Sequence, residues 1–254
     1  MSQIHDAAQG FQSAATAYDR GRPDYPAQVS GWLRDNLGIT PGKTVLDLGA
    51  GTGKFTQRLV TTGATVIAVE PVDAMREKLT ASLPQAQALS GTAETIPLPD
   101  ASVDAVVCAQ AFHWFATKAA LVEISRVLRP GGKLGLIWNM RDESRPWVAE
   151  LTAIIQPHEG DAPRAYKGTW KAAFPVAMLT PLVEERFDHG HTGSPEDVIV
   201  SRTLSTSFIA KLPQAEQDAV AARLRTLIAT RPELSGRAEV TYPYVTFAYS
   251  ATRT

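Results

Sequence analysis

Short apolar runs alternate with longer amphipathic stretches over the first 140 residues of the chain. The runs are almost continuously apolar, which is typical of parallel strands whose two faces are both covered by helices. The stretches repeat apolar residues at helical spacing, as where Leu121, Ile124 and Leu128 fall on one face. The pattern predicts strands at 45–48, 65–69, 86–89, 103–109 and 133–138, and helices from about 54 to 60, 73 to 82 and 117 to 128. This alternation indicates an α/β fold built on a doubly wound sheet.

The two ends of the chain add further elements to this core. Residues 1–40 carry apolar residues at helical spacing and predict a helical lid, and residues 195–230 predict two helices that cap a pocket. Residues 183–187 and 240–249 predict two late strands. A chain of 254 residues can bury one sizeable α/β core, so we expect residues 1–254 to form a single domain.

Three alternating glycines, Gly49, Gly51 and Gly53, follow the first strand. Glycines at such a junction allow a sharp turn and a close approach of the backbone to a ligand. A Walker A loop needs Gly-Lys-Ser/Thr, but here Lys54 is followed by Phe55. The dinucleotide fingerprint needs a further glycine where Lys54 stands. The turn therefore predicts a ligand site and disfavours triphosphate and pyrophosphate ligands.

A carboxylate ends the second strand, since Glu70 follows the run at 65–69. A carboxylate at this strand end accepts hydrogen bonds from ribose hydroxyls of a bound nucleoside. The glycine turn and Glu70 together predict a nucleoside-containing ligand.

Four motifs in order and spacing resemble class I S-adenosylmethionine-dependent methyltransferases: Asp47-Leu-Gly-Ala-Gly-Thr-Gly53, Val69-Glu-Pro71, Gly91-Thr-Ala-Glu-Thr-Ile-Pro-Leu98 and Leu128-Arg-Pro-Gly-Gly132. The phrase Ala109-Gln-Ala-Phe-His-Trp-Phe115 is similar to the small-molecule branch that contains the trans-aconitate methyltransferases. The resemblance implies a Rossmann-like, seven-stranded, mostly parallel sheet with an antiparallel edge, with residues 43–140 as the cofactor-binding core. It also places the late strands and cap helices in residues 141–254.

The resemblance implies that S-adenosyl-L-methionine is the cofactor and S-adenosyl-L-homocysteine the product. Glu70 is then expected to bind the ribose, and Asp47 either to orient the glycine loop or to meet the cofactor's amino group. Met75 either packs on the adenine or fills the core, and Thr92 stands where many relatives carry Asp. The full set of expected cofactor residues is Asp47, Gly49, Ala50, Gly51, Thr52, Gly53, Glu70, Pro71, Met75, Thr92, Ala93, Glu94 and Gln110.

The substrate site is expected at the carboxyl edge of the sheet, directly after the fourth strand. His113 is the candidate general base because its ordinary pKa of about 6.5 suits proton removal near neutrality. The alternative is that His113 walls the pocket or orients the substrate. Phe112 and Trp114 either face the sulfonium or pack against the lid.

Arginines supply candidate contacts to an anionic substrate, because planar guanidinium groups suit carboxylates. Arg20 and Arg22 either clamp such a group or pair with neighbouring aspartates, and Arg202 is a further candidate. The full set of expected substrate residues is Tyr18, Arg20, Arg22, Tyr25, Phe112, Trp114, Trp138, Asn139 and Arg202.

Composition and charge limit the classes of ligand and partner that we expect. A formal net charge of −1 gives no general attraction to nucleic acid. A single cysteine, Cys108, suits a reducing cytoplasm, and we identify neither a signal peptide nor a membrane span. No metal-ligand spacing is recognisable, so we expect metal-free methyl transfer to a small molecule, such as a carboxylic acid, by a cytoplasmic monomer or homodimer. A dinucleotide-dependent oxidoreductase and a non-catalytic S-adenosylmethionine-binding protein are the alternatives.

Overall fold

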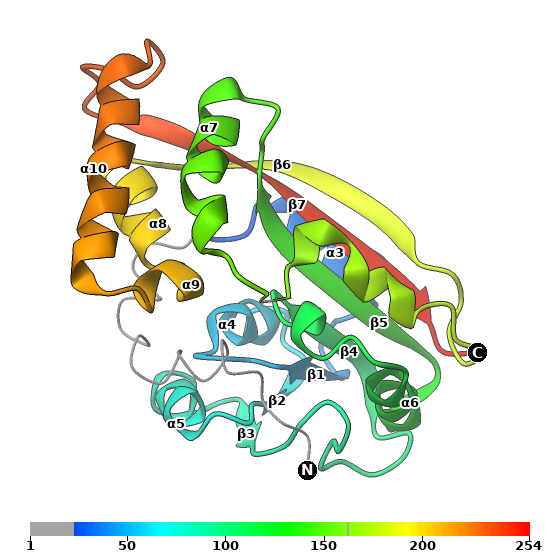
Figure 1. The fold of residues 1–254 in the computed structure, drawn as a ribbon. Helices are drawn as coiled ribbons and strands as arrows, with labels where there is room; N and C mark the ends of the chain where they lie inside the picture. The colour runs from blue at the N-terminus through cyan, green and yellow to red at the C-terminus, as the bar shows by residue number, and fades with distance from the viewer. Residues whose placement is uncertain (1–22, 162) are drawn as a thin grey trace.

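The computed structural model describes residues 23–161 and 163–254, which fold around one seven-stranded sheet (Figure 1). The strands lie in the order β3-β2-β1-β4-β5-β7-β6. Neighbours among β1 to β5 pair in parallel, whereas β7 runs antiparallel to both β5 and β6. The strands are β1 Thr44–Leu48, β2 Thr65–Val69, β3 Gln87–Leu89, β4 Val103–Ala109, β5 Leu128–Arg141, β6 Val183–Gly193 and β7 Val240–Thr252. The expected mostly parallel sheet with an antiparallel edge is confirmed.

Helices cover both faces of the sheet, which explains why the central strands are apolar on both sides. On one face, α6 packs against alternate residues of the central strands, such as Leu46 and Val106. On the other face, α3 and α4 pack against the intervening residues, such as Val45 and Val107. The α-helices are α3 Gln28–Asp35, α4 Lys54–Val60, α5 Asp73–Ser82, α6 Lys118–Val127, α7 Pro146–Ile155, α8 Arg202–Leu204, α9 Ser207–Ala210 and α10 Gln214–Thr230. Shorter helical segments are η1 Phe112–Trp114, η2 Gln156–His158, η3 Ala165–Lys167, η4 Thr169–Ala173 and the π-helix η5 Glu196–Ser201.

The described part of the expected lid is a core helix. Trp32 and Leu33 of α3 are almost fully buried. A Cβ built on Gly135 of β5 would lie 2.5 Å from Leu37 and 2.9 Å from Trp32, so these side chains press directly on the sheet. The expectation of a lid is therefore wrong for α3, because its apolar face covers the sheet, whereas Tyr25, before α3, does line the cavity. The rest of the expected lid, 1–22, lies outside the described residues.

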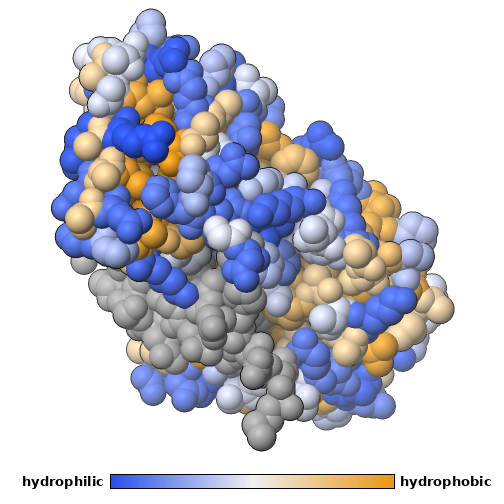
Figure 2. All heavy atoms as spheres, in the orientation of Figure 1, coloured by the Kyte–Doolittle hydropathy of each residue, from blue (hydrophilic) through white to orange (hydrophobic). Residues whose placement is uncertain are grey.

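A second hydrophobic core forms the cap, where β6 and β7 extend beyond the other strands (Figure 1). Trp147 and Leu151 of α7, Val198 of η5 and Leu224 of α10 pack here against Tyr242 of β7. Hydrophilic side chains are interspersed with smaller hydrophobic areas on the face shown in Figure 2. Within the described residues, no helix is both long and apolar enough to cross a membrane.

Several element boundaries differ from the expectations. The helix α7 was not expected. The first expected cap helix begins as the π-helix η5, continues directly into α8, and is separated from α9 by the extended backbone of Thr206. Residues 128–132 do end α6, but they also join β5, with a register irregularity against β4. The paired strands β6 and β7 run longer than expected because each pairs residue by residue with its partner into the cap.

Candidate functional site

A cavity of about 790 Å³ lies where the carboxyl ends of the parallel strands meet the cap. The order of the sheet reverses between β1 and β4, and open α/β sheets bind ligands at this switch point. The volume falls within the range of roughly 300–1,000 Å³ that is usual for small-molecule sites. The loops after β1, β2 and β4 form one wall, and segments of the cap form the opposite wall.

The glycine loop follows β1 with a backbone that favours glycine. Gly49 and Gly51 have φ values of +75° and +59°, in the left-handed region. A Cβ on Gly49 would lie 2.8 Å from Ala111, so a side chain there would collide with the end of β4. Gly51 and its neighbours Ala50 and Thr52 line the cavity. The loop therefore presents its backbone to a ligand, as the sequence predicts.

Gly53 has a different role from the one expected, because it does not line the cavity. It precedes α4 with a φ of +91°, and a Cβ there would lie 2.9 Å from Leu83 and 3.0 Å from Leu79. Glycine is needed at this position for close packing of α4 on α5. We therefore correct the expected cofactor contact of Gly53 to a packing role.

Glu70 is held rigidly at the end of β2 and is only 6% exposed. Its Oε2 accepts a hydrogen bond from Gly51 N at 2.9 Å, and its Oε1 accepts one from Val72 N at 2.9 Å. Burial, the largest influence, raises the pKa of Glu70, and the two backbone hydrogen bonds oppose this shift. A carboxylate has about four acceptor sites, so each oxygen can accept a further hydrogen bond from a ligand hydroxyl. This geometry fits the two hydroxyls of a ribose.

Asp47 lines the cavity and carries a buried acceptor atom that has no hydrogen-bond partner among the described residues. Its Oδ2 accepts a hydrogen bond from Thr56 Oγ1 at 2.6 Å, whereas its Oδ1 has no hydrogen-bond partner among the described residues. Burial, reinforced by the charge of Glu70, raises the pKa of Asp47 to about 7. A buried carboxylate oxygen without a partner is costly, and a ligand ammonium group would satisfy it. The structure thus favours the interpretation that Asp47 meets the cofactor's amino group.

The expected adenine contacts lie together on the same side of the cavity. Pro71 and Met75 follow β2, and the segment Thr92, Ala93 and Glu94 follows β3. Met75 is buried, and its Sδ lies 4.0 Å from a Cβ built on Gly51. Met75 therefore both packs in the protein and lines the cavity, so the two interpretations of this residue are compatible.

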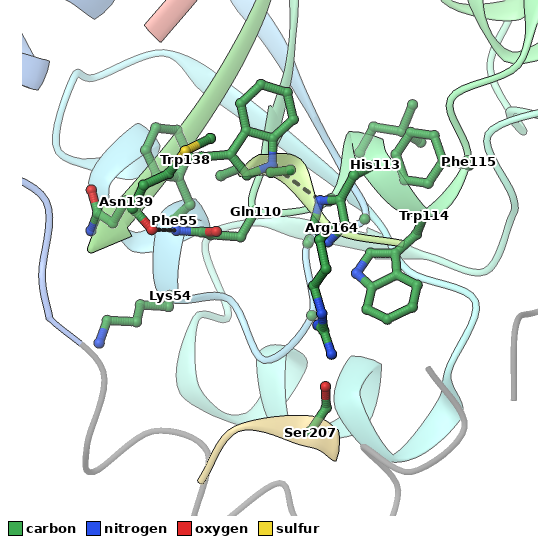
Figure 3. A pocket seen from close by; sticks show the side chains of 18 of the residues that line it. Lys54, Phe55, Gln110, His113, Trp114, Phe115, Trp138, Asn139, Arg164 and Ser207 are labelled. Atoms are coloured by element: carbon green, nitrogen blue, oxygen red, sulfur yellow. Dashed lines mark hydrogen bonds between the residues drawn. The ribbon is translucent and has the colours of Figure 1, made fainter. Parts of the chain in front are cut away.

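Gln110 ends β4 with an unusual backbone, since its φ is +57°. A residue other than glycine in this region is strained, and such strain concentrates at functional sites. Its side chain is fixed because Nε2 donates a hydrogen bond to the carbonyl oxygen of Asn139 at 3.3 Å (Figure 3). Gln110, Asn139 and Tyr25 all line the cavity, as expected.

His113 accepts a hydrogen bond at Nδ1 from Trp138 Nε1 at 3.1 Å (Figure 3). Nδ1 is therefore unprotonated, and the single ring proton of the neutral imidazole is on Nε2. Such a ring presents an N–H at Nε2 and cannot accept a proton there. This hydrogen bond favours the alternative, in which His113 walls the pocket or orients the substrate, and the general-base role stays a prediction.

The aromatic residues after β4 divide between core and cavity. Phe112 is fully buried and packs edge-to-face on Phe115 at 5.7 Å and on Trp170 at 6.2 Å. It does not line the cavity, so the expected substrate contact is wrong: the turn η1 directs Phe112 into the core. Phe115 lines the cavity instead, together with Trp114 and Trp138, which were expected.

The cationic side chains that line the cavity were only partly expected. Arg202 lines the cavity as expected, and its Nη1 donates a hydrogen bond to Thr206 Oγ1 at 3.3 Å. Arg141 and Arg164 also line it but were not among the expected residues. The expected contacts Tyr18, Arg20 and Arg22 lie outside the described residues. Among residues 23–161 and 163–254, no group of three or more His, Cys, Asp or Glu side chains is placed to hold a metal ion.

Comparison with known proteins agrees with this geometry. A family model described as a methyltransferase domain matches residues 46–136, which include the glycine loop, Glu70 and His113. An uncharacterised methyltransferase of Mycobacterium tuberculosis is 42% identical over 247 residues, which cover 97% of each chain. An uncharacterised methyltransferase-like protein of Schizosaccharomyces pombe is 37% identical and covers 95% of this chain and 94% of its own.

Solved structures show the same fold. A putative type II methyltransferase from Anaeromyxobacter dehalogenans has a TM-score of 0.63 at 24% identity and covers 91% of this chain and 96% of its own. A putative methyltransferase from an antibiotic biosynthesis pathway of Anabaena variabilis has a TM-score of 0.61 at 20% identity, with 90% and 98% covered. Sequence relatives, fold and site geometry agree, and the chain belongs to the class I S-adenosylmethionine-dependent methyltransferases.

Proposed function

We propose that this methyltransferase transfers the methyl group to a small molecule, a carboxylic acid, held between the carboxyl edge of the sheet and the cap. The observation that carries the proposal is the single cavity of about 790 Å³ that is lined both by Asp47 and Glu70 and by the cap residues Arg164 and Phe208. One cavity can thus hold the cofactor on the sheet side and a small acceptor on the cap side. Membership of the trans-aconitate-methyltransferase-like branch stays a prediction of the sequence.

The reaction depends mainly on alignment of the acceptor atom with the methyl carbon, because the sulfonium of the bound cofactor already activates the methyl group. An acceptor atom donates an electron pair to the methyl carbon, the carbon–sulfur bond breaks, and sulfur keeps the bonding pair. Alignment of the two reactants alone contributes roughly 7–11 kcal/mol in well-oriented systems. The chain's part is to bind both molecules in line and to exclude water from between them.

Each wall of the cavity has a defined part in this alignment. Glu70 and Asp47 hold the cofactor from the ends of β2 and β1. Trp114 and Trp138 shield the region beside His113 from water. His113 donates through Nε2 and so orients an acceptor oxygen rather than removing a proton. This role suits a carboxylic acid, because its carboxylate oxygen has no proton to lose at neutral pH.

The charge of the cap wall supports an anionic acceptor. Arg141, Arg164 and Arg202 line this wall together with the carboxylates Glu143 and Glu159. The cations outnumber the anions, so the wall favours a ligand with negative charge. Action on free small molecules rather than on nucleic acid, in a cytoplasmic monomer or homodimer, remains a prediction of the sequence.

The test is to identify which molecules of a cell extract receive the labelled methyl group. Purified protein is incubated with methyl-labelled S-adenosylmethionine and either the ultrafiltered small-molecule fraction or the retained macromolecules. We expect label in the small-molecule fraction, in acid-extractable anionic products, and none with Glu70→Ala. Label found only in protein or nucleic acid would contradict the small acceptor, and cofactor binding without any transfer would support the non-catalytic alternative.

A further inference from the structure

Arg164 reaches into the cavity from the cap, just before η3. Its side chain is only 13% exposed. In Figure 3 its guanidinium group extends between His113 and Ser207. Arg164 thus places a cation beside the residues that follow β4, in the same cavity as Asp47 and Glu70.

Two of the guanidinium nitrogens are buried and unused. Nε and Nη2 of Arg164 have no hydrogen-bond partner among the described residues. The guanidinium carbon lies 4.4 Å from the ring centre of Phe208, a cation–π contact that leaves its N–H groups without an acceptor. The side chain is therefore held in place while its Nε and Nη2 donors lack an acceptor.

The nearest carboxylate, that of Glu159, forms an ion pair with Arg164 but no hydrogen bond, and its Oε1 has no hydrogen-bond partner among the described residues. Nε of Arg164 lies 3.6 Å from Oε1 of Glu159, which is beyond hydrogen-bond length. Lys167 Nζ lies 2.7 Å from the same oxygen, and the Tyr166 hydroxyl donates to Oε2 of Glu159 at 2.6 Å. Glu159 balances part of the charge of Arg164 but leaves its N–H groups without an acceptor.

This arrangement is costly for the protein alone. A buried charged group that lacks hydrogen bonds carries its full desolvation penalty. Burial, as the largest influence, lowers the pKa of Arg164, although Glu159 opposes that shift. A ligand anion that accepts from the open N–H groups would offset this cost.

The positions of the two unpartnered nitrogens, Nε and Nη2, indicate which kind of anion Arg164 can bind. Nε and Nη2 lie on the same edge of a guanidinium group, so their hydrogens point in parallel and match the two oxygens of a carboxylate. We propose that Arg164 binds a carboxylate group of the acceptor side-on through Nε and Nη2. This inference rests on the proposed function and adds the residue that selects an anionic acceptor.

The position of Arg164 assigns the anion to the acceptor rather than to the cofactor. The residues that fit the cofactor come from β1, β2 and the loops after them, whereas Arg164 directly precedes η3 and the ring beside it, Phe208, belongs to α9. The anion bound there lies next to His113 and Trp114, at the end of β4, where the acceptor must meet the methyl group.

The first arm of the test compares acids with matched neutral amides. Benzoate, phenylacetate and hexanoate, with benzamide, phenylacetamide and hexanamide, are titrated into protein saturated with S-adenosylhomocysteine and followed by ligand-observed NMR. We expect at least one acid to bind roughly tenfold more tightly than its amide, since charge-assisted hydrogen bonds contribute about 1.5–3 kcal/mol. Arg164→Gln should remove this preference, and Arg164→Lys should keep part of it.

Two controls distinguish a loss of carboxylate binding from a loss of folding in the Arg164 variants. Arg223→Gln removes an exposed arginine of α10 that does not line the cavity, and it should keep the preference for acids. The thermal unfolding midpoint of each variant shows whether it folds, and Arg164→Lys keeps the charge if Arg164→Gln does not fold.

The outcomes are distinct. If Arg164→Gln keeps the preference for acids, the proposal is overturned while the proposed function stands. If no acid binds, or if acids and amides bind alike, the proposal is overturned together with the carboxylic acid as acceptor, whereas methyl transfer to a small molecule stands. If Arg164→Gln instead weakens binding of S-adenosylhomocysteine about tenfold, the guanidinium serves the cofactor's carboxylate and the proposal is also overturned. Failure of the unmodified protein to bind S-adenosylhomocysteine would overturn the proposed function itself.

Discussion

Asp47 should make cofactor binding depend on pH in the neutral range. In the free protein, burial raises the pKa of this carboxyl to about 7, and its Oδ1 is buried without a hydrogen-bond partner among the described residues. A ligand ammonium group binds the ionised form and therefore lowers this pKa. Affinity for S-adenosylhomocysteine should thus increase as pH rises through the pKa of the free protein.

The size of the effect follows from that pKa. With a pKa of about 7, roughly one molecule in eleven is ionised at pH 6 and roughly ten in eleven at pH 8. The affinity should therefore increase about tenfold over this interval, or about 1.4 kcal/mol. Stability of the free protein changes in the opposite direction: a carboxyl whose folded pKa is raised contributes stability below its unfolded pKa of about 3.9, and this contribution is lost as pH rises through about 7.

Calorimetric titration with S-adenosylhomocysteine at pH 6, 7 and 8 measures the effect. Asp47→Asn cannot titrate, so its affinity should be weaker at pH 8 and nearly independent of pH. Asp35→Asn removes an exposed carboxylate of α3 and should keep the pH dependence of the unmodified protein. An unmodified protein whose affinity is the same at pH 6 and pH 8, or an Asp47→Asn variant with an unchanged profile, would refute the reasoning.

Two further predictions concern positions that support the site. Gly53→Ala should destabilise the protein by about 1–3 kcal/mol in urea unfolding, because its φ is +91° and the new Cβ would lie 2.9 Å from Leu83; a loss below about 0.5 kcal/mol would contradict the packing role. Trp138→Phe removes the donor to His113, so ¹⁵N NMR should show the Nε2–H tautomer in the unmodified protein and a mixture of tautomers in the variant. An Nδ1–H tautomer in the unmodified protein would show that the hydrogen bond is absent.

The fold was predictable where local pattern and burial agree. The central strands are covered on both faces, so their apolar runs predict β1, β2 and β4 directly. The helix α3 shows the limit of this reasoning, because an amphipathic helix has the same spacing whether it lies on a sheet or over a pocket. The spacing of Trp147, Val148 and Leu151 is also helical and could have revealed α7.

The site was predictable where residues follow strand ends. Asp47 and Glu70 end neighbouring parallel strands, so the fold alone brings them to one edge. Phe112 was misplaced because the turn η1, which the sequence pattern does not reveal, rotates it into the core. Arg164 lies in a segment without periodicity, and only tertiary folding places it over the cavity. Its open donors are a property of the packed structure, so the sequence carries no signal for them.

The most direct test of the account is calorimetric titration of the unmodified protein and Glu70→Ala with S-adenosylhomocysteine. Glu77→Ala, which removes an exposed carboxylate of α5, is the matched control. The account predicts binding that weakens by at least about tenfold, or about 1.4 kcal/mol, in Glu70→Ala and is unchanged in Glu77→Ala. Absence of binding to the well-folded unmodified protein, or equal affinity in Glu70→Ala, would contradict a cofactor site at the ends of β1 and β2.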